Sequence, residues 1–334
     1  MTAPSVGSRF QILRRLGQGG MGVVYEALDR ERNQRVALKT LHALDAQGLL
    51  QLKNEFSVLL DLHHPNLVRL GELVSHDEQW FFTMELVDGT DLLTHVRWPS
   101  VSLFGPRADA PTMGRGEPIA GAMPRAPPTS EAAQFDEGRL RSAMAQLAAA
   151  VTALHEAGKV HRDIKPSNVL VDRAGRLVLL DFGLATDARG ATSWTDLRPV
   201  GTAAYMAPEQ ASSNAVGPAA DWYSVGVVLY EALTGRLPFV GTPIAMLLDK
   251  QRGEPPPPRA VVPGTPADLD ALCVDLLRFD PRERPSGPDS LRRLGGEVVV
   301  ERRRLAAAAR RRARGRPAPL DVGGRARAVR RPRS

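Results

Sequence analysis

The stretch that decides the fold is His161-Arg162-Asp163-Ile164-Lys165-Pro166-Ser167-Asn168, which begins three residues after Gly158. Its His, Arg, Asp, Lys and Asn stand at set spacing. At roughly 1 in 20 per position, this pattern would occur by chance in about one in ten thousand chains of this length. Asp163 can accept the proton of a substrate hydroxyl, and Asn168 can hold a magnesium ion. The stretch therefore predicts a catalytic loop that carries a base and a metal ligand.

A second acidic motif follows the catalytic loop. Asp181-Phe182-Gly183 comes thirteen residues after Asn168, directly behind an apolar run at residues 177–180 that predicts a strand. Its carboxylate would be a further ligand for magnesium. Three residues alone carry little information, but their order and distance after the catalytic loop make them informative.

Upstream, a glycine-rich motif, Gly17-x-Gly19-x-x-Gly22-x-Val24, lies between two predicted strands. Glycines let the backbone approach phosphates and donate N–H bonds without a side-chain clash. With 30 glycines in 334 residues, such spacing should arise by chance about 0.2 times per chain, so alone it is weak.

Lys39 ends the next apolar strand, Val36-Ala37-Leu38-Lys39. A lysine in this position is ordinarily a surface residue with a buried stem. A partner would be needed to hold its ammonium group inward, and Glu55, on a predicted intervening helix, is the candidate. The pair could then grip the α- and β-phosphates of a nucleotide.

Further along, Gly201-Thr202 precedes Ala207-Pro208-Glu209, and Arg284 follows near the end of the apolar pattern. A buried Glu209 would need a cationic partner, for which Arg284 is the natural choice. The alternative is a surface ion pair that contributes little to stability.

The pattern of apolar residues divides the chain into two regions. From Phe10 to about Val87, short strands are predicted, among them residues 23–25, 36–39 and 80–86. Helical spacing predicts one helix among them, over residues 51–62. From about Leu140 the chain becomes mainly helical, and its first helix should end at Gly158. The fold class is therefore α+β, with a small β-rich lobe followed by a helical lobe.

Two segments lack this apolar periodicity. Residues 97–134 are rich in Pro, Gly, Ala and Ser, which favours a flexible insert whose role is that of a solvated spacer or, alternatively, a regulatory segment. Residues 295–334 form a basic Arg- and Ala-rich tail, which we expect to be disordered at least in part. Residues 301–334 hold 13 arginines against two acidic residues, which leaves the rest of the chain at −4 within a total net charge of +7. The basic character therefore belongs to the tail.

Composition allows a globular enzyme, because 43% of the 334 residues are hydrophobic and can fill a sizeable core. The single cysteine, Cys273, excludes an internal disulfide and favours a reducing compartment. No basic region followed by an apolar stretch opens the sequence, and no apolar run reaches the ~18 residues of a membrane span. We therefore expect a cytoplasmic protein.

These motifs, in this order, resemble the eukaryotic-type (Hanks-type) serine/threonine protein kinase family from about residue 10 to residue 294. The run Gly201-Thr-Ala-Ala-Tyr-Met-Ala-Pro-Glu209 and the Arg, Ala and Pro bias look most like the bacterial members. The resemblance implies a bilobal protein kinase fold, with residues 10–87 as N-lobe and 88–294 as C-lobe. Residues 1–9 would be an N-terminal extension.

The resemblance also implies an ATP site. Met84 would be the gatekeeper, with backbone groups of Glu85 and Val87 reaching the edge of the adenine. Asp91 would bind the ribose. The side chains implied around the adenine are Leu16, Val24, Ala37 and Leu170, and the implied phosphate contacts are Gly17, Gly19, Gly22 and Lys39.

The implied activity is transfer of the γ-phosphoryl group of ATP to Ser/Thr hydroxyls of proteins, the chain itself included, in bacterial signal transduction. Lys165, two residues after Asp163, and Thr202 match the serine/threonine branch. ATP and Mg²⁺, with Mn²⁺ as an alternative, are the implied cofactors. The implied catalytic residues are Asp163, Lys165, Lys39, Glu55 and Thr202, and the implied metal ligands are Asn168 and Asp181.

Arg162, next to the catalytic base, implies control by a phosphate on the following segment. Thr192, Ser193 and Thr195 are the candidate sites of autophosphorylation, because a phosphate there would pair with the arginine and order the loop. Self-association for this reaction would follow.

His161 would have a structural role in the same resemblance. It would stack with Phe182, Leu70 and Leu59 in an internal apolar column, which makes it a packing residue and not a base.

Two other readings compete with an active kinase. A pseudokinase scaffold would normally lack a catalytic residue, and none is missing here. Alternatively, the basic tail would be the functional end and would contact nucleic acid or an anionic surface. No aromatic residue interleaves its arginines, which weakens base stacking as a mode of binding.

Overall fold

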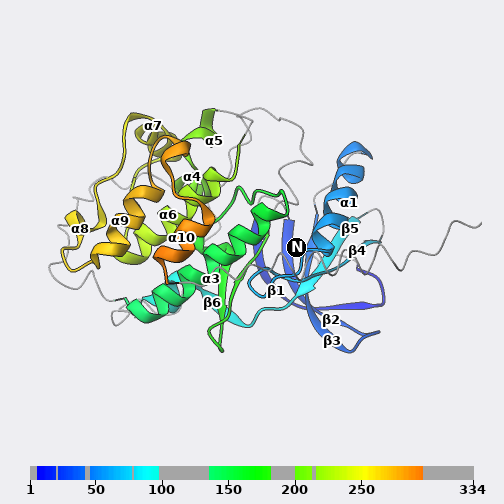
Figure 1. The fold of residues 1–334 in the computed structure, drawn as a ribbon. Helices are drawn as coiled ribbons and strands as arrows, with labels where there is room; N and C mark the ends of the chain where they lie inside the picture. The colour runs from blue at the N-terminus through cyan, green and yellow to red at the C-terminus, as the bar shows by residue number, and fades with distance from the viewer. Residues whose placement is uncertain are drawn as a thin grey trace, which may run out of the picture. The chain divides into compact units, whose positions relative to one another are not determined.

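The fold is described by a computed structural model (Figure 1) for residues 6–19, 22–41, 46–76, 79–97, 135–181, 200–212 and 216–295. The predicted insert and the predicted tail lie outside the described residues, apart from Arg97 and Gly295 at their edges. The described part of the chain contains no helix that is both long and apolar enough to cross a membrane.

A five-stranded sheet forms the N-terminal region, with every neighbouring pair antiparallel and the order β1-β2-β3-β5-β4. The strands predicted at residues 23–25, 36–39 and 80–86 are confirmed as β2, β3 and β5, although Leu86 lies past the end of β5. The strands are β1 (Phe10–Gly19), β2 (Gly22–Asp29), β3 (Gln34–Thr40), β4 (Leu70–His76) and β5 (Gln79–Glu85).

One helix, α1 (Ala46–Leu60), is the only helix between β3 and β4 in the described residues. The helix predicted over residues 51–62 is confirmed, but it starts five residues earlier and ends two residues earlier. Leu52, Phe56 and Leu59 are buried, and the Phe56 ring lies 5.7 Å from that of Phe82 on β5. Their spacing of three and four residues is what places them on one side of the helix.

The C-terminal region begins with a small sheet of β6 (Gly89–Asp91), β7 (Val169–Asp172) and β8 (Leu177–Leu179), in that order. It joins the loop after α1, because the Val68 N–H donates to the Leu179 carbonyl at 3.0 Å. The remaining helices are α2 (Leu92–Val96), α3 (Glu137–Glu156), α4 (Val200–Tyr205), α5 (Pro208–Ser212), α6 (Ala219–Thr234), α7 (Pro243–Arg252), α8 (Pro258–Val261), α9 (Ala267–Leu276) and α10 (Gly287–Arg293), with short 3-10 turns at Pro166–Asn168 and Pro281–Glu283.

Helices α3 and α6 provide the largest share of the core of this region. Asp136 caps α3 by accepting the Arg139 N–H at 2.9 Å, and the helix ends, as predicted, where Gly158 adopts a left-handed φ of 73° that favours glycine. Helix α6 is buried almost throughout. A Cβ at Gly226 would lie 2.8 Å from the Leu276 Cβ, so glycine lets α6 approach α9 closely.

Together, the sheet with its helix and the mainly helical region that follows are the predicted α+β arrangement.

Candidate active site

The catalytic loop holds Asp163 in a defined position. The Lys165 ammonium lies 2.8 Å from Asp163 Oδ2, and the Asn168 amide nitrogen donates to the same oxygen at 3.1 Å and to the Asp163 carbonyl at 2.8 Å. The Asp163 side chain keeps 19% of its surface exposed. A carboxylate that is oriented in this way and still reachable is suited to accept a proton from a substrate.

Asp221, in the first turn of α6, holds the backbone of the catalytic loop in place. Its carboxylate is fully buried and accepts the backbone N–H of His161 at 2.8 Å and of Arg162 at 2.7 Å. It also lies 2.7 Å from His155 Nε2. Arg162 has a φ of 66°, a conformation that a non-glycine residue keeps only when its surroundings enforce it.

Asp221 is not among the site residues predicted from the sequence. The available signal was an acidic residue at the start of a strongly apolar helix, where a buried carboxylate requires partners.

Backbone groups occupy both ring nitrogens of His161. Its Nδ1 accepts the Asp163 N–H at 3.2 Å, and its Nε2 lies 2.7 Å from the Leu180 carbonyl oxygen. This agrees with a structural role. The predicted stacking includes Phe182, which lies outside the described residues, and stays a prediction.

Lys39 and Asp181 are brought together from distant parts of the sequence. The Lys39 ammonium lies 2.7 Å from Asp181 Oδ2, and the Lys39 side chain is only 7% exposed. Asp181, two residues after the end of β8, has a φ of 56°, a further constrained backbone position. Glu55 on α1 is buried, and its pairing with Lys39 stays a prediction.

The glycine-rich motif forms the turn between β1 and β2, where Gly17 pairs with Val24 and Gly19 with Gly22. Gly22 has a φ of 146°, and a Cβ there would lie 1.8 Å from the Thr40 carbonyl oxygen. Only glycine fits at this point. The tip of the turn, residues 20 and 21, is outside the described residues.

The predicted adenine residues come from neighbouring strands. Ala37 on β3 faces Met84 on β5 in register, and both are buried. Asp91 accepts the backbone N–H of Thr94 at 3.0 Å and its hydroxyl at 2.7 Å, so it caps α2. The other predicted members are Leu16 on β1, Val24 on β2, Leu170 on β7, and Glu85 and Val87 at and just beyond the end of β5.

The pairing predicted between Glu209 and Arg284 is confirmed. The guanidinium makes two bonds to the carboxylate, at 2.6 and 2.9 Å, and its side chain is fully buried. It also donates to the Ala219 and Arg278 carbonyls at 2.9 Å each. The alternative of a weak surface pair is therefore excluded.

The donors present fit a hard cation. Asp181 offers carboxylate oxygens and Asn168 an amide oxygen, its nitrogen being bonded to Asp163; Mg²⁺ prefers such ligands and completes its shell with water and phosphate. Within the described ranges, no cluster of three or more His, Cys, Asp or Glu side chains forms a metal site. These two residues would therefore hold the ion together with the nucleotide.

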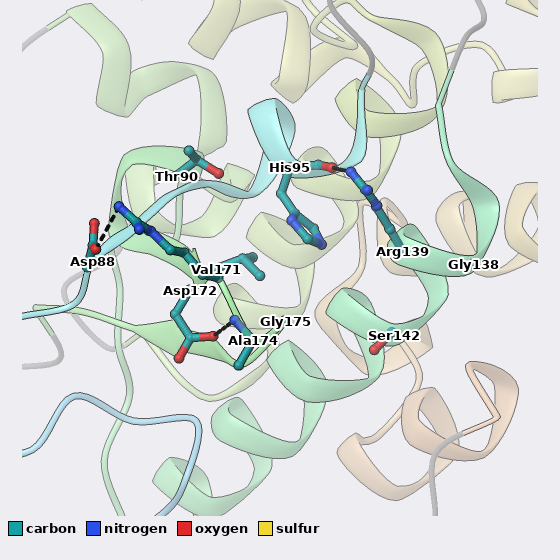
Figure 2. Close-up of a pocket in the computed structure, with 12 residues that line it drawn as sticks. Asp88, Thr90, His95, Gly138, Arg139, Ser142, Val171, Asp172, Ala174 and Gly175 are labelled. Atoms are coloured by element: carbon teal, nitrogen blue, oxygen red, sulfur yellow. Dashed lines mark hydrogen bonds and ion pairs between the residues drawn. The ribbon is translucent and has the colours of Figure 1, made fainter.

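A separate cavity of about 690 Å³ lies elsewhere, between α2, α3 and the β7–β8 turn (Figure 2). It is lined by polar groups that bind one another: Arg173 pairs with Asp88 at 3.1 Å, and Asp172 accepts the Ala174 N–H at 2.9 Å. None of the predicted catalytic or nucleotide-binding residues lines it.

The segment expected to carry regulatory phosphates, with Thr192, Ser193 and Thr195, falls outside the described residues, as does the side chain of Thr202. Their roles stay predictions.

This fold and this arrangement of side chains agree with the family that the sequence matches. The protein kinase domain family matches residues 10–293, and the chain belongs to that family.

Its relatives are bacterial serine/threonine kinases. Serine/threonine-protein kinase PkaA of Streptomyces coelicolor is 34% identical over 316 residues, covering 89% of this chain and 51% of that protein. PrkC of Bacillus subtilis is 30% identical over 283 residues, covering 84% and 39%. The chain thus spans about half or less of the length of these relatives.

Among solved structures, the kinase domain of Mycobacterium tuberculosis PknI has a TM-score of 0.61 at 23% identity, covering 88% of this chain and 98% of that chain. The two share the protein kinase fold.

Proposed function

We propose that residues 10–294 transfer the γ-phosphoryl group of ATP to serine or threonine hydroxyls of proteins, as part of bacterial signalling. The observation that supports this most is the geometry of Asp163, oriented by Lys165 and Asn168 at hydrogen-bond distance and exposed on one side. Family membership and the relatives named above support the same activity.

In this reaction the substrate hydroxyl oxygen bonds to the γ-phosphorus while the bond to the β–γ bridging oxygen breaks. ADP leaves, and the hydroxyl proton passes to the Asp163 carboxylate. Lys165, 2.8 Å from that carboxylate, is placed to neutralise charge on the transferred group. Catalysis of this type depends mostly on positioning and on electrostatic stabilisation.

Lys39 would bind the α- and β-phosphates, with Glu55 as its proposed second partner. A magnesium or manganese ion held by Asp181 and Asn168 would neutralise charge on the phosphate oxygens. The 2.7 Å contact of Lys39 with Asp181 supports one continuous phosphate-binding region that includes both residues.

Regulation through Arg162 is a further part of the proposal. A phosphate on Thr192, Ser193 or Thr195, added by another copy of the chain, would pair with this arginine. Mass spectrometry that finds all three residues unmodified in fully active protein would contradict it. A cytoplasmic location also belongs to the proposal and can be tested by cell fractionation.

The first experiment measures transfer of labelled γ-phosphate from Mg-ATP to the protein itself and to a generic basic protein. Asp163→Asn should lower transfer by about 10²- to 10⁴-fold, since it removes the base and keeps the shape. Asp289→Asn, which removes an exposed carboxylate on α10, serves as the matched control and should transfer like the wild type.

The competing reading is a scaffold that binds nucleotide without transfer. Absence of incorporation by the wild-type protein with either Mg²⁺ or Mn²⁺, before and after treatment with phosphatase, would favour it. Transfer that persists in Asp163→Asn would instead refute the assigned base.

A further inference from the structure

Lys250 is a buried lysine in a helix whose other charged side chains are exposed. It lies on α7 and is only 1% exposed. Its ammonium nitrogen lies 2.9 Å from the Ala203 carbonyl oxygen and 2.7 Å from those of Ala204 and Met206. An ammonium group has three N–H donors and no acceptor. When Lys250 is protonated, each of its three donors therefore has one carbonyl acceptor.

These carbonyls belong to one short stretch, residues 203–206, which we call the 203–206 segment. The one carbonyl that Lys250 does not bind, that of Tyr205, accepts the Ser224 hydroxyl of α6 at 2.8 Å. Side chains from α6 and α7 therefore bind all four carbonyl oxygens of the segment. Its backbone conformation is set by these bonds as well as by its own helical turn.

The 203–206 segment is tied to the catalytic loop. Gln210 accepts the Ala207 N–H at 2.9 Å through Oε1 and donates to the Arg162 carbonyl at 3.1 Å through Nε2. Arg162 precedes the catalytic base. Ala207, which directly follows the segment, is thereby linked to the loop that carries the base, so the segment lies where residues next to a substrate hydroxyl would be placed.

The surroundings of Lys250 show that backbone carbonyls, and not an ion pair, hold it. In the described ranges no carboxylate pairs with it. The acidic side chains on α7 and on the adjacent α5 are paired elsewhere, Asp249 with Arg252 and Glu209 with Arg284. The Tyr223 ring lies 5.5 Å from the ammonium. The neighbouring Gln251 adds a 2.7 Å bond to the Pro208 carbonyl.

We propose that Lys250 is a positioning residue that shapes the 203–206 segment for the protein substrate and thereby controls binding of that substrate, not of ATP. The role rests on the kinase activity proposed above. Among the described residues, Lys250 makes no hydrogen bond or ion pair with Asp163 or with the predicted nucleotide residues, so we expect it to act through the segment.

The test compares full-length wild type with Lys250→Met, which keeps much of the side-chain length and removes all donors. The KM for a generic basic protein substrate should rise by about tenfold or more, because several hydrogen bonds that fix the segment are lost. The KM for ATP should change less than about twofold. Arg252→Met, on the same helix with an exposed side chain, is the matched control and should change neither value.

A change of both KM values in Lys250→Met, or of neither, would overturn the proposal. If Lys250→Met does not fold, Lys250→Gln, which retains two N–H donors, is measured in its place, with the same split between the two KM values expected.

A second readout does not depend on phosphoryl transfer. Hydrogen exchange of peptides that cover residues 201–212 should be faster in Lys250→Met than in the wild type, and unchanged in Arg252→Met. If the wild type shows no transfer at all, the proposed function fails, and this measurement still decides whether Lys250 orders the segment. Equal exchange in Lys250→Met and wild type would refute the role.

Discussion

Arg284 places a full positive charge where water does not reach, and Glu209 is the residue that neutralises it. Removing one partner of a buried pair leaves the other charge uncompensated, which costs far more than the pair contributes when intact. The carbonyls of Ala219 and Arg278 also bind the guanidinium, so they reduce this cost without supplying a negative charge.

We therefore expect Glu209→Ala to lower the free energy of unfolding by about 3 kcal/mol, measured by urea denaturation. Arg282→Ala, which removes an exposed arginine paired with Asp280, is the control and should leave the midpoint unchanged. Equal midpoints for both variants would show that the buried pair is not a source of stability.

Individual residues differ in how far their roles could be predicted from the sequence. The partnership of Glu209 and Arg284 was predictable because an acidic residue in an apolar context requires a cation. Lys250 was not, because the run Asp249-Lys250 looks like the solvated face of an amphipathic helix. Only the packing of α7 against α4 and α5 makes it a buried residue.

At the scale of elements, one ionisable group, the Lys250 ammonium, connects α7 to the 203–206 segment. Burial lowers the pKa of Lys250 to about 7, whereas an unfolded lysine titrates near 10.4. Between these values the unfolded chain binds one more proton than the native protein, so stability rises with pH. Tyr223, whose pKa burial raises, stays neutral across this range.

Relative to Lys250→Met, the wild type should therefore gain at most about 1.4 kcal/mol of unfolding free energy per pH unit between pH 7 and 9. Urea denaturation of both proteins at the two pH values measures this. The three hydrogen bonds to carbonyls favour the charged form of Lys250. If the difference in unfolding free energy between the two proteins does not vary with pH, these bonds fully offset the effect of burial on the pKa.

Element types and several of their limits were predictable for similar physical reasons. The apolar spacing of residues 51–62 and the stop at Gly158 depend on local rules that a sequence displays directly. The earlier start of α1 and the short helix α4 were missed, since neither stretch of sequence carries a strong local signal for a helix.

At the scale of the whole molecule, charge is distributed very unevenly. The chain carries a net charge of +7, and its last 34 residues hold 13 arginines against Glu301 and Asp321. Without them the net charge would be −4. The predicted order of motifs identified the family, but nothing in a local pattern shows what such a tail contacts.

If the tail binds polyanions by charge alone, wild-type protein should bind a random-sequence DNA duplex at low salt and lose it by about 0.5 M salt. Deletion of residues 301–334 should abolish that binding, measured by fluorescence anisotropy, and leave phosphoryl transfer intact. Binding that persists in the deletion variant, or at high salt, would contradict a purely electrostatic tail.

The buried carboxylate of Asp221 has one more consequence. It is part of a core helix, yet it fixes the backbone of the two residues before the catalytic base. The loop therefore has no conformational independence from the core. Substitutions that loosen α6 should lower activity even when they lie well away from the catalytic loop. The protein should also lose its activity and its fold at the same temperature.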